Sequence, residues 1–486
     1  MSDLMNDNTR VNNSGGQLRR NAVGLPHIVF FVVAAAAPMT SVVGATPPAF
    51  AFGNGAGVPG AFILAGILYL IFSMGFTTLA RRVKGAGAFY TYITQGLGRP
   101  AGLAGAFMAL AAYFAIQVAI YALFGVFAAA EVGPLGLNLP WWVWAFIALS
   151  VVTFCGQRNI EVSGRILGIC MVAEITILLL LNIAIMLHSG HKAAPSLGLS
   201  GFLPSEIFSK GLGLTLVFVF GSYSGFEATA IFGEEARNPE RTIPRATYIA
   251  VILITVFYAF SSWAIVQYYG PANVQAAANK SMSDFYFNPA RLLLGNWDEQ
   301  IMNLLMLSSL FACLLCFHNT LTRYFFALGR DGVAWRPLAK VHALHGSPHI
   351  AGWVQSALAL IIILGFMIAH SDPYGVIFSW LSAFGVLGIL AIQVMVSIAV
   401  IVFFRREAKT RSVLMTIVAP ILAAIGLAGA FILVSMNLGL LTGSSNIMVH
   451  LFPVIMLGIG ALGAVLALRV KYSNPDIYAR LGESLN

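Results

Sequence analysis

The stretch Ser222-Tyr-Ser-Gly-Phe-Glu-Ala-Thr-Ala-Ile231 lies inside an apolar segment that covers residues 212–232. Two glycines, Gly221 and Gly225, interrupt this segment, and Glu227 places a carboxyl group within it. Irregular backbone at membrane depth is tolerated only where protein buries it or where it lines a wet cavity. An acidic residue at that depth marks a functional site by default. The stretch therefore predicts one wall of a transport site.

The composition of the chain excludes an ordinary soluble protein. Of 486 residues, 59% are hydrophobic and only 9% are charged, whereas roughly a quarter of the residues of soluble domains are charged. About a dozen apolar runs approach the ~20 residues that a helix needs to cross a bilayer. We expect an all-α polytopic membrane protein with twelve transmembrane helices, because a β-barrel would instead show alternating strands of ~10 residues. The expected spans are 27–52, 59–80, 101–130, 141–155, 163–188, 211–233, 245–269, 298–327, 350–369, 374–403, 413–437 and 449–468.

The basic residues favour one orientation of these spans. With the N-terminus inside, nearly all of the 27 lysines and arginines fall on the cytoplasmic side, which is the positive-inside bias. The exceptions are Lys192, Lys210, Lys280 and Arg291. Both termini are then cytoplasmic, with residues 1–24 as a disordered tail and residues 471–486 as a C-terminal tail. The net charge of +9 reflects these loops and does not indicate a nucleic-acid partner.

Two of the expected spans carry helix-breaking residues. The first contains Pro38-Met-Thr-Ser-Val-Val-Gly-Ala-Thr-Pro-Pro48, and the sixth contains Phe220-Gly-Ser-Tyr-Ser-Gly-Phe226. Proline removes a backbone donor, and glycine relaxes the constraint on the backbone dihedrals. Breaks in spans 1 and 6, five spans apart, predict two inverted repeats that hold a substrate at the membrane midplane between the broken helices.

These breaks divide the chain into regions. We expect a transport core over 25–403, with repeats of about 25–190 and 205–403, followed by two peripheral spans over 404–470. The long loop 270–297 is rich in aromatic residues. It either covers the outer mouth as a lid or forms an amphipathic surface helix, and the sequence favours neither.

Three segments carry signatures of one family of membrane proteins. Residues 220–246 read FGSYSGFEATAIFGEEARNPERTIPRA, residues 323–341 read RYFFALGRDGVAWRPLAKV, and residues 85–92 read GAGAFYTY. They resemble the sixth-span signature, the Arg-Asp-Gly loop after span eight, and the turn before span three of the amino acid–polyamine–organocation (APC) superfamily of transporters. The resemblance implies a five-plus-five inverted repeat and secondary transport by alternating access around a central site.

The resemblance also implies a substrate site at the break in span one. Superfamily members usually carry a Gly-x-Gly there, whose bare amides receive a substrate carboxylate at the positive end of the following half-helix. The matching residues here are Thr40, Ser41, Val42, Val43 and the displaced Gly44. The hydroxyl groups of Thr40 and Ser41 are alternative ligands for the carboxylate. A Pro-Met-Thr opening without an early glycine is similar to the putrescine-importer branch.

The break in span six supplies the facing wall of this site. The residues that match the superfamily's aromatic gate are Gly221 and Ser222, and these small side chains predict a roomier or more polar pocket. Phe220 and Tyr223 are candidate rings for a substrate ammonium, a contact worth ~0.5–2 kcal/mol. The remaining candidates in this span are Ser224 and Gly225.

Span three contributes two further polar candidates. Tyr113 and Gln117 lie one helical turn apart. They either line the substrate pocket or form a hydrogen-bonded polar pair inside the helix bundle.

Two intramembrane acids are candidates for ion coupling. Glu174 lies nine residues after Arg165, where many proton-coupled members of the superfamily hold a lysine. Apolar surroundings favour the neutral form of a carboxyl group, so Glu174 is expected to take up and release the coupling proton. Its alternatives are a cation ligand, a partner of the substrate amine and a structural hydrogen bond. Glu227 is the second candidate, and it either joins backbone groups at the break or faces the substrate.

These features predict a secondary active transporter of the plasma membrane, here the bacterial inner membrane, that imports an amino acid or a related organic amine with protons. The alternative is import of a polyamine or monoamine resembling putrescine or ethanolamine, or exchange. No enzyme activity, cofactor or metal is expected, and no G-x-x-x-x-G-K-[ST] motif indicates ATP as the driver. The expected partners are the substrate, a proton and the lipid bilayer, for a monomer or a homodimer.

Overall fold

The fold is all-helical. The computed structural model describes residues 24–25, 28–29, 32–33, 36–83, 88–158, 164–188, 198–226, 238–342, 346–407, 412–441 and 447–482. This part of the chain contains no strand, and nine of its helices are long and apolar enough to cross a membrane. The prediction of an all-helical chain with several membrane-length apolar helices is confirmed.

The helices follow the apolar runs of the sequence. The longer ones are α3 (Val58–Ala80), α5 (Arg99–Val132), α6 (Trp141–Gln157), α7 (Gly164–His188), α10 (Pro239–Tyr269), α13 (Asn296–Arg330), α14 (His349–Ile368), α15 (Ser379–Arg406), α16 (Ala419–Asn437) and α18 (Phe452–Ser473). The shorter ones are α2 (Thr46–Phe52), α4 (Ala88–Leu97), α8 (Pro204–Ile207), α9 (Leu212–Ser222), α11 (Val274–Lys280), α12 (Phe287–Leu293), α17 (Ile447–His450) and α19 (Pro475–Arg480).

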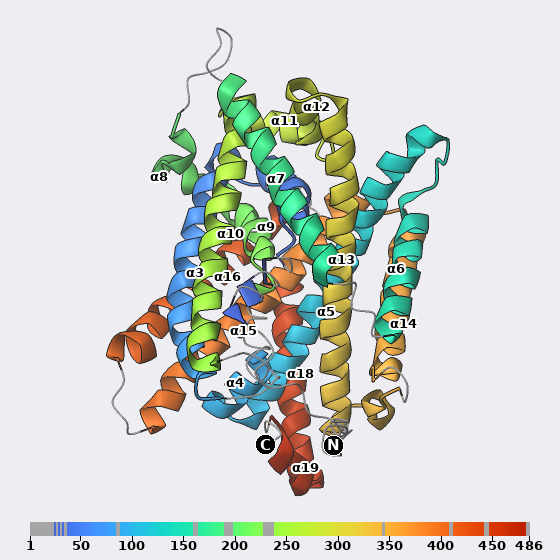
Figure 1. Ribbon diagram of the computed structural model, residues 1–486. Coiled ribbons are helices and arrows are strands. Elements are labelled where there is room, and N and C mark those ends of the chain that lie inside the picture. The colour runs from blue at the N-terminus through green and yellow to red at the C-terminus, as the bar shows by residue number, and fades with distance from the viewer. Residues whose placement is uncertain are drawn as a thin grey trace, which may run out of the picture.

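The long helices form two groups around α5. On one side α3 packs against α10 and also contacts α2 and α9. On the other side α6 and α14 pack together at the edge of the molecule, next to α5 and α13 (Figure 1). Helices α15, α16 and α18 complete the bundle. Small residues allow close approach: a methyl group on Gly463 of α18 would lie 2.6 Å from the carbonyl oxygen of Leu103 in α5.

The first apolar segment is not one continuous helix. Its helical hydrogen bonding reaches Ala36, whose N–H donates to the Val32 carbonyl (3.0 Å). Ala37 then adopts a φ of +45°, in the left-handed region, which ends the helix. Pro38 has no N–H to continue the ladder, and a second stretch begins there, passes through the π-helical turn Thr40–Ala45 and continues as α2. The break leaves the first amides of this second stretch in the protein interior.

The sixth apolar segment is also interrupted. Helix α9 ends at Ser222, and residues 223–225 form a turn that ends with Gly225 at a φ of +109°. Only glycine adopts this conformation without strain. Glu227 lies outside the described residues.

The long segment after α10 packs inward. The side chains of Phe285, Tyr286 and Phe287 are almost fully buried. The Tyr286 hydroxyl pairs with Thr46 Oγ1 at 2.9 Å, and Asn279 donates to the Ala51 carbonyl. The loop, with α11 and α12, therefore covers the α2 end of the bundle, opposite α4 and α19 (Figure 1).

The segment expected to be a C-terminal tail is docked on the molecule. Leu481 is only 1% exposed, and Arg99 donates to the Ala479 carbonyl. Beside it, Tyr90 donates to Asp331 at 3.4 Å, and burial raises the pKa of the Asp331 carboxyl. The residues that surround Leu481 in this small apolar cluster are Tyr90, Leu103, Ala106, Leu328 and Ala467. The chain thus joins α4, α5, α13 and α18 at this end.

Candidate functional site

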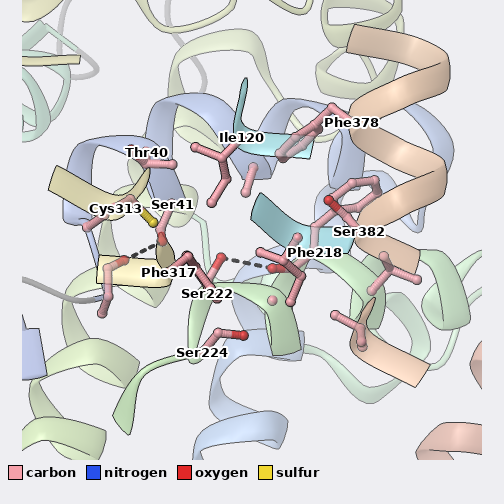
Figure 2. Close-up of a pocket in the computed structure, with 17 residues that line it drawn as sticks. Thr40, Ser41, Ile120, Phe218, Ser222, Ser224, Cys313, Phe317, Phe378 and Ser382 are labelled. Atoms are coloured by element: carbon pink, nitrogen blue, oxygen red, sulfur yellow. Dashed lines mark hydrogen bonds between the residues drawn. The ribbon is translucent and has the colours of Figure 1, made fainter. Parts of the chain in front are cut away.

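A cavity of about 60 Å³ lies beside the break in the first apolar segment. Its walls come from both sides of that break and from α5, α9, α13 and α15, with the turn before α15 (Figure 2). A space of this size holds several water molecules, since one water needs about 10–15 Å³ on this measure. None of the described lining residues carries a charge.

Hydroxyl groups supply most of the polarity of the cavity. Ser41 and Ser222 are engaged, because each donates to a carbonyl of its own segment, Ala36 (2.7 Å) and Phe218 (2.8 Å) respectively. Thr40 Oγ1 and Ser224 Oγ are buried and have no hydrogen-bond partner among the described residues. A buried polar atom without a partner costs about 1–3 kcal/mol. These two hydroxyls are therefore ready to bind a polar ligand group.

Apolar side chains form the rest of the wall. The rings of Phe218 and Phe378 are stacked, with centroids 6.1 Å apart and planes 21° apart. Phe317 enters from α13, and Ile116 and Ile120 enter from α5. Such a wall suits an apolar group of a ligand, while the hydroxyl groups suit its polar end.

A carboxyl group caps the amides that follow the break. Glu174 in α7 is 4% exposed, and its Oε2 accepts the Met39 N–H at 3.2 Å and the Ser309 hydroxyl at 2.9 Å. The Thr40 N–H points at Ser309 Oγ at 3.4 Å. The start of a helix carries unpaired N–H groups and a partial positive charge, both of which favour a carboxylate there. Glu174 thus lies just behind the cavity wall.

The structure does not place the two span-three candidates in the cavity. Gln117 is fully buried, and its Oε1 accepts a hydrogen bond from Gln355 of α14. The Tyr113 ring packs against Phe317, with centroids 5.9 Å apart. The face of α5 that lines the cavity instead carries Ile116 and Ile120. Each of the two residues thus contacts a different neighbour inside the bundle.

The two aromatic candidates of span six also point elsewhere. Tyr223 donates to the Phe62 carbonyl (3.0 Å) and pairs with Thr255 Oγ1 (2.8 Å). The Phe220 ring meets Tyr69 edge to face at 5.4 Å. Both rings therefore face α3 and α10 and do not belong to the described lining of the cavity; a contact of either ring with a substrate ammonium stays a prediction.

The ring that does reach the cavity from α9 is Phe218. It precedes Gly221 and Ser222 by three and four positions, which places all three residues on one helix face. This spacing is the signal that would have found it. Two further pairs at the same helical spacing line the cavity unforeseen, Cys313 with Phe317 and Phe378 with Ser382.

The remaining candidates support the site from outside its lining. Val42 and Val43 are buried in the core, and the Gly44 carbonyl accepts a hydrogen bond from Tyr374 at 2.7 Å. Gly225 forms the turn after α9. Among the residues that the structure describes, no three His, Cys, Asp or Glu side chains come together as a metal site would require.

Comparison with known proteins gives a consistent picture. A family model described as "Amino acid permease" matches residues 27–463. The branched-chain amino acid permease BcaP of Bacillus subtilis is 24% identical over 371 residues, which cover 73% of this chain and 75% of that protein. The aromatic amino acid transport protein AroP of Escherichia coli is 27% identical over 341 residues, 67% of this chain and 71% of that protein. The gamma-aminobutyric acid permease of Escherichia coli is 24% identical over 313 residues, 63% and 65% respectively.

Proposed function

Because this chain belongs to the amino acid permease family of transporters, we propose that it imports an amino acid with an uncharged side chain, by alternating access and with a proton. Family membership confirms the resemblance to the APC superfamily and makes the chain a transporter of amino acids, not an enzyme. The uncharged side chain of the substrate, the coupling ion and the mechanism are the parts that we propose.

The observation that carries this proposal is the cavity beside the broken first segment. It offers the hydroxyl groups of Thr40 and Ser224, which have no partner in the described part of the chain, and a wall of phenyl and aliphatic side chains. A charged substrate side chain would be left without a counter-charge among the described lining residues, at a large desolvation cost. The named substrates of two relatives, branched-chain and aromatic amino acids, have side chains of the kind that this wall suits.

We further propose twelve spans, the first ten of them in two inverted repeats of about 25–190 and 205–403. The packing supports this scheme, because helices that occupy corresponding positions in the two halves lie against each other: α3 with α10, α5 with α13, and α6 with α14. Such pairing is expected around a pseudo-two-fold axis in the membrane plane.

The proposed orientation places the α4 and α19 end in the cytoplasm of a bacterial cell. The helix ends at that side carry most of the described arginines, for example Arg81, Arg330 and Arg405, while Lys280 and Arg291 lie at the α11 and α12 end. This distribution is the positive-inside bias.

Glu174 is the proposed proton carrier. It is buried, and its carboxyl group accepts two hydrogen bonds: one from the Met39 N–H at the break of the first segment, and one from the Ser309 hydroxyl of α13. This carboxyl group therefore links α7, the first segment and α13. Gain or loss of its proton therefore changes contacts that must rearrange when access alternates.

Import of a polyamine is not favoured. A diamine needs a counter-charge at each end, and the described lining of the cavity contains no carboxylate. The relatives named above are described as transporters of amino acids.

Uptake into sealed liposomes tests the proposal. Purified protein should accumulate radiolabelled leucine, phenylalanine or serine when the liposome interior is alkaline, and a protonophore should abolish the accumulation. Arginine, glutamate and putrescine serve as matched charged solutes and should not accumulate. Glu174→Gln should still exchange labelled for unlabelled substrate but should no longer accumulate it. Absence of amino acid uptake under every ion gradient would refute the proposal, and uptake of putrescine alone would favour the amine alternative.

A further inference from the structure

The amides that begin the second half of the first segment are already occupied by the protein. The Met39 N–H is bound to the Glu174 carboxyl, and the Ser41 N–H is bound to the Ala37 carbonyl at 2.9 Å. The Thr40 N–H has the longest contact, 3.4 Å to Ser309 Oγ. A substrate carboxylate that approaches this helix start therefore meets Glu174, whose carboxyl group already accepts the first of these amides.

The cavity brings such a carboxylate to the same place. Ala37, Thr40 and Ser41 line the cavity on both sides of Met39. The Thr40 hydroxyl, which has no partner among the residues that the structure describes, lies beside the N–H of the same residue, whose own contact is long. A carboxylate bound to Thr40 would lie one residue away from the amide that Glu174 caps. Two ionised carboxylates this close repel each other in a water-poor interior, so one of them must be neutral.

The described groups around Glu174 offer no fixed positive charge that would remove this repulsion. Helix α10 presents the Tyr258 phenol and α13 presents the Cys313 thiol, and both groups are ordinarily uncharged at neutral pH. Helix α12 also packs against α7, but its Arg291 is paired with Glu299 at 2.9 Å. Among the described residues, none of the groups that interact with Glu174 is cationic. A proton is thus the charge that can neutralise it.

We propose that Glu174 and the carboxylate of the substrate compete for this helix start, so that binding of one amino acid draws one proton from solution onto Glu174. The inference rests on the proposed function, because it requires a substrate with a carboxylate. The proton adds to the ionised carboxylate of Glu174, and no other covalent bond changes. By reciprocity the proton raises the affinity for substrate as much as substrate raises the affinity for the proton. The link between the two ligands therefore lies in a shared hydrogen-bonding site.

The dissociation constant of purified wild-type protein for its amino acid should depend on pH. Between about pH 5.5 and about pH 7.5, binding should weaken as pH rises, by up to about tenfold per pH unit where Glu174 is ionised. Glu174→Gln removes the titrating group and should bind equally at both values. Asp298→Asn, which removes a buried carboxyl at the far end of α13, is the matched control and should keep the wild-type pH dependence. A pH-independent constant in wild type, or wild-type pH dependence in Glu174→Gln, would overturn the competition.

A second measurement uses only the wild-type protein and remains valid if Glu174→Gln does not fold. Infrared difference spectra at about pH 7.5 should show the carbonyl band of a protonated carboxyl group appearing when amino acid is added. The decarboxylated amine of the same substrate should bind without this band and without pH dependence. A difference spectrum without the band overturns the competition while leaving amino acid transport standing. Failure to bind any amino acid rejects the proposed function, and the competition falls with it.

Discussion

Substitution of Gly221, which lines the cavity, tests directly whether the cavity binds the side chain of the substrate. A methyl group added there would lie 3.6 Å from Val386 Cγ2, which is an ordinary van der Waals contact, so Gly221→Ala fits without strain. The methyl group would take up part of a cavity of only about 60 Å³. One methyl group more or less in a hydrophobic pocket changes discrimination by about 1–3 kcal/mol, or 10–200-fold.

The effect should depend on the size of the substrate. In liposomes that contain Gly221→Ala, competition by leucine or phenylalanine against labelled substrate should weaken by about tenfold or more, while competition by alanine should change little. Gly365→Ala in α14 is the matched control, because a methyl group there would meet no atom within 4 Å. An equal change for every amino acid, or an equal change in the control, would refute the assignment of the cavity.

Three further outcomes are expected. Gly463→Ala should force α18 away from α5 and lower stability by about 1–3 kcal/mol, seen as a lower melting temperature of the detergent-solubilised protein; an unchanged melting temperature would contradict the close backbone approach. Tyr223→Phe should cost about 1 kcal/mol of stability but leave substrate affinity unchanged, whereas Phe218→Ala should weaken the affinity for apolar amino acids; the reverse pattern would mean that the ring facing the substrate is misassigned. Leu481→Asp should destabilise the protein by about 2–5 kcal/mol through loss of a buried side chain, and limited proteolysis would show whether the end of the chain is released.

The helices were largely predictable from sequence because a membrane leaves few choices for the backbone. The expected span 101–130 became α5, which starts only two residues earlier, at Arg99. The polar ends of the helices were harder to predict from the sequence. Helix α10 begins at Pro239, six residues before the expected apolar span, because proline suits the first turn of a helix. Within the expected stretch of residues 38–48, the hydrogen-bond ladder stops at the first residue, because Pro38 has no N–H and Ala37 before it adopts a φ of +45°.

The lining of the cavity was harder to predict because it depends on how each helix is rotated about its axis. Polar residues were the natural candidates, yet inside a bundle they also satisfy one another, as Gln117 does with Gln355. On α5 the neighbouring face, with Ile116, reaches the cavity instead. Glu174 could be singled out as a buried acid, but its partner Met39 could not, because backbone amides leave no mark in a sequence.

The burial of Leu481 in its apolar cluster affects how the protein can be tagged for expression. Its walls come from helices made early and late in synthesis, α4 and α5 at one extreme and α18 at the other. The apolar cluster at that end of the bundle can therefore be completed only after the ribosome has released the residues near 480. A purification handle or fluorescent reporter placed close behind Leu481 would crowd this apolar cluster, whereas a flexible glycine- and serine-rich spacer would keep the handle away from it.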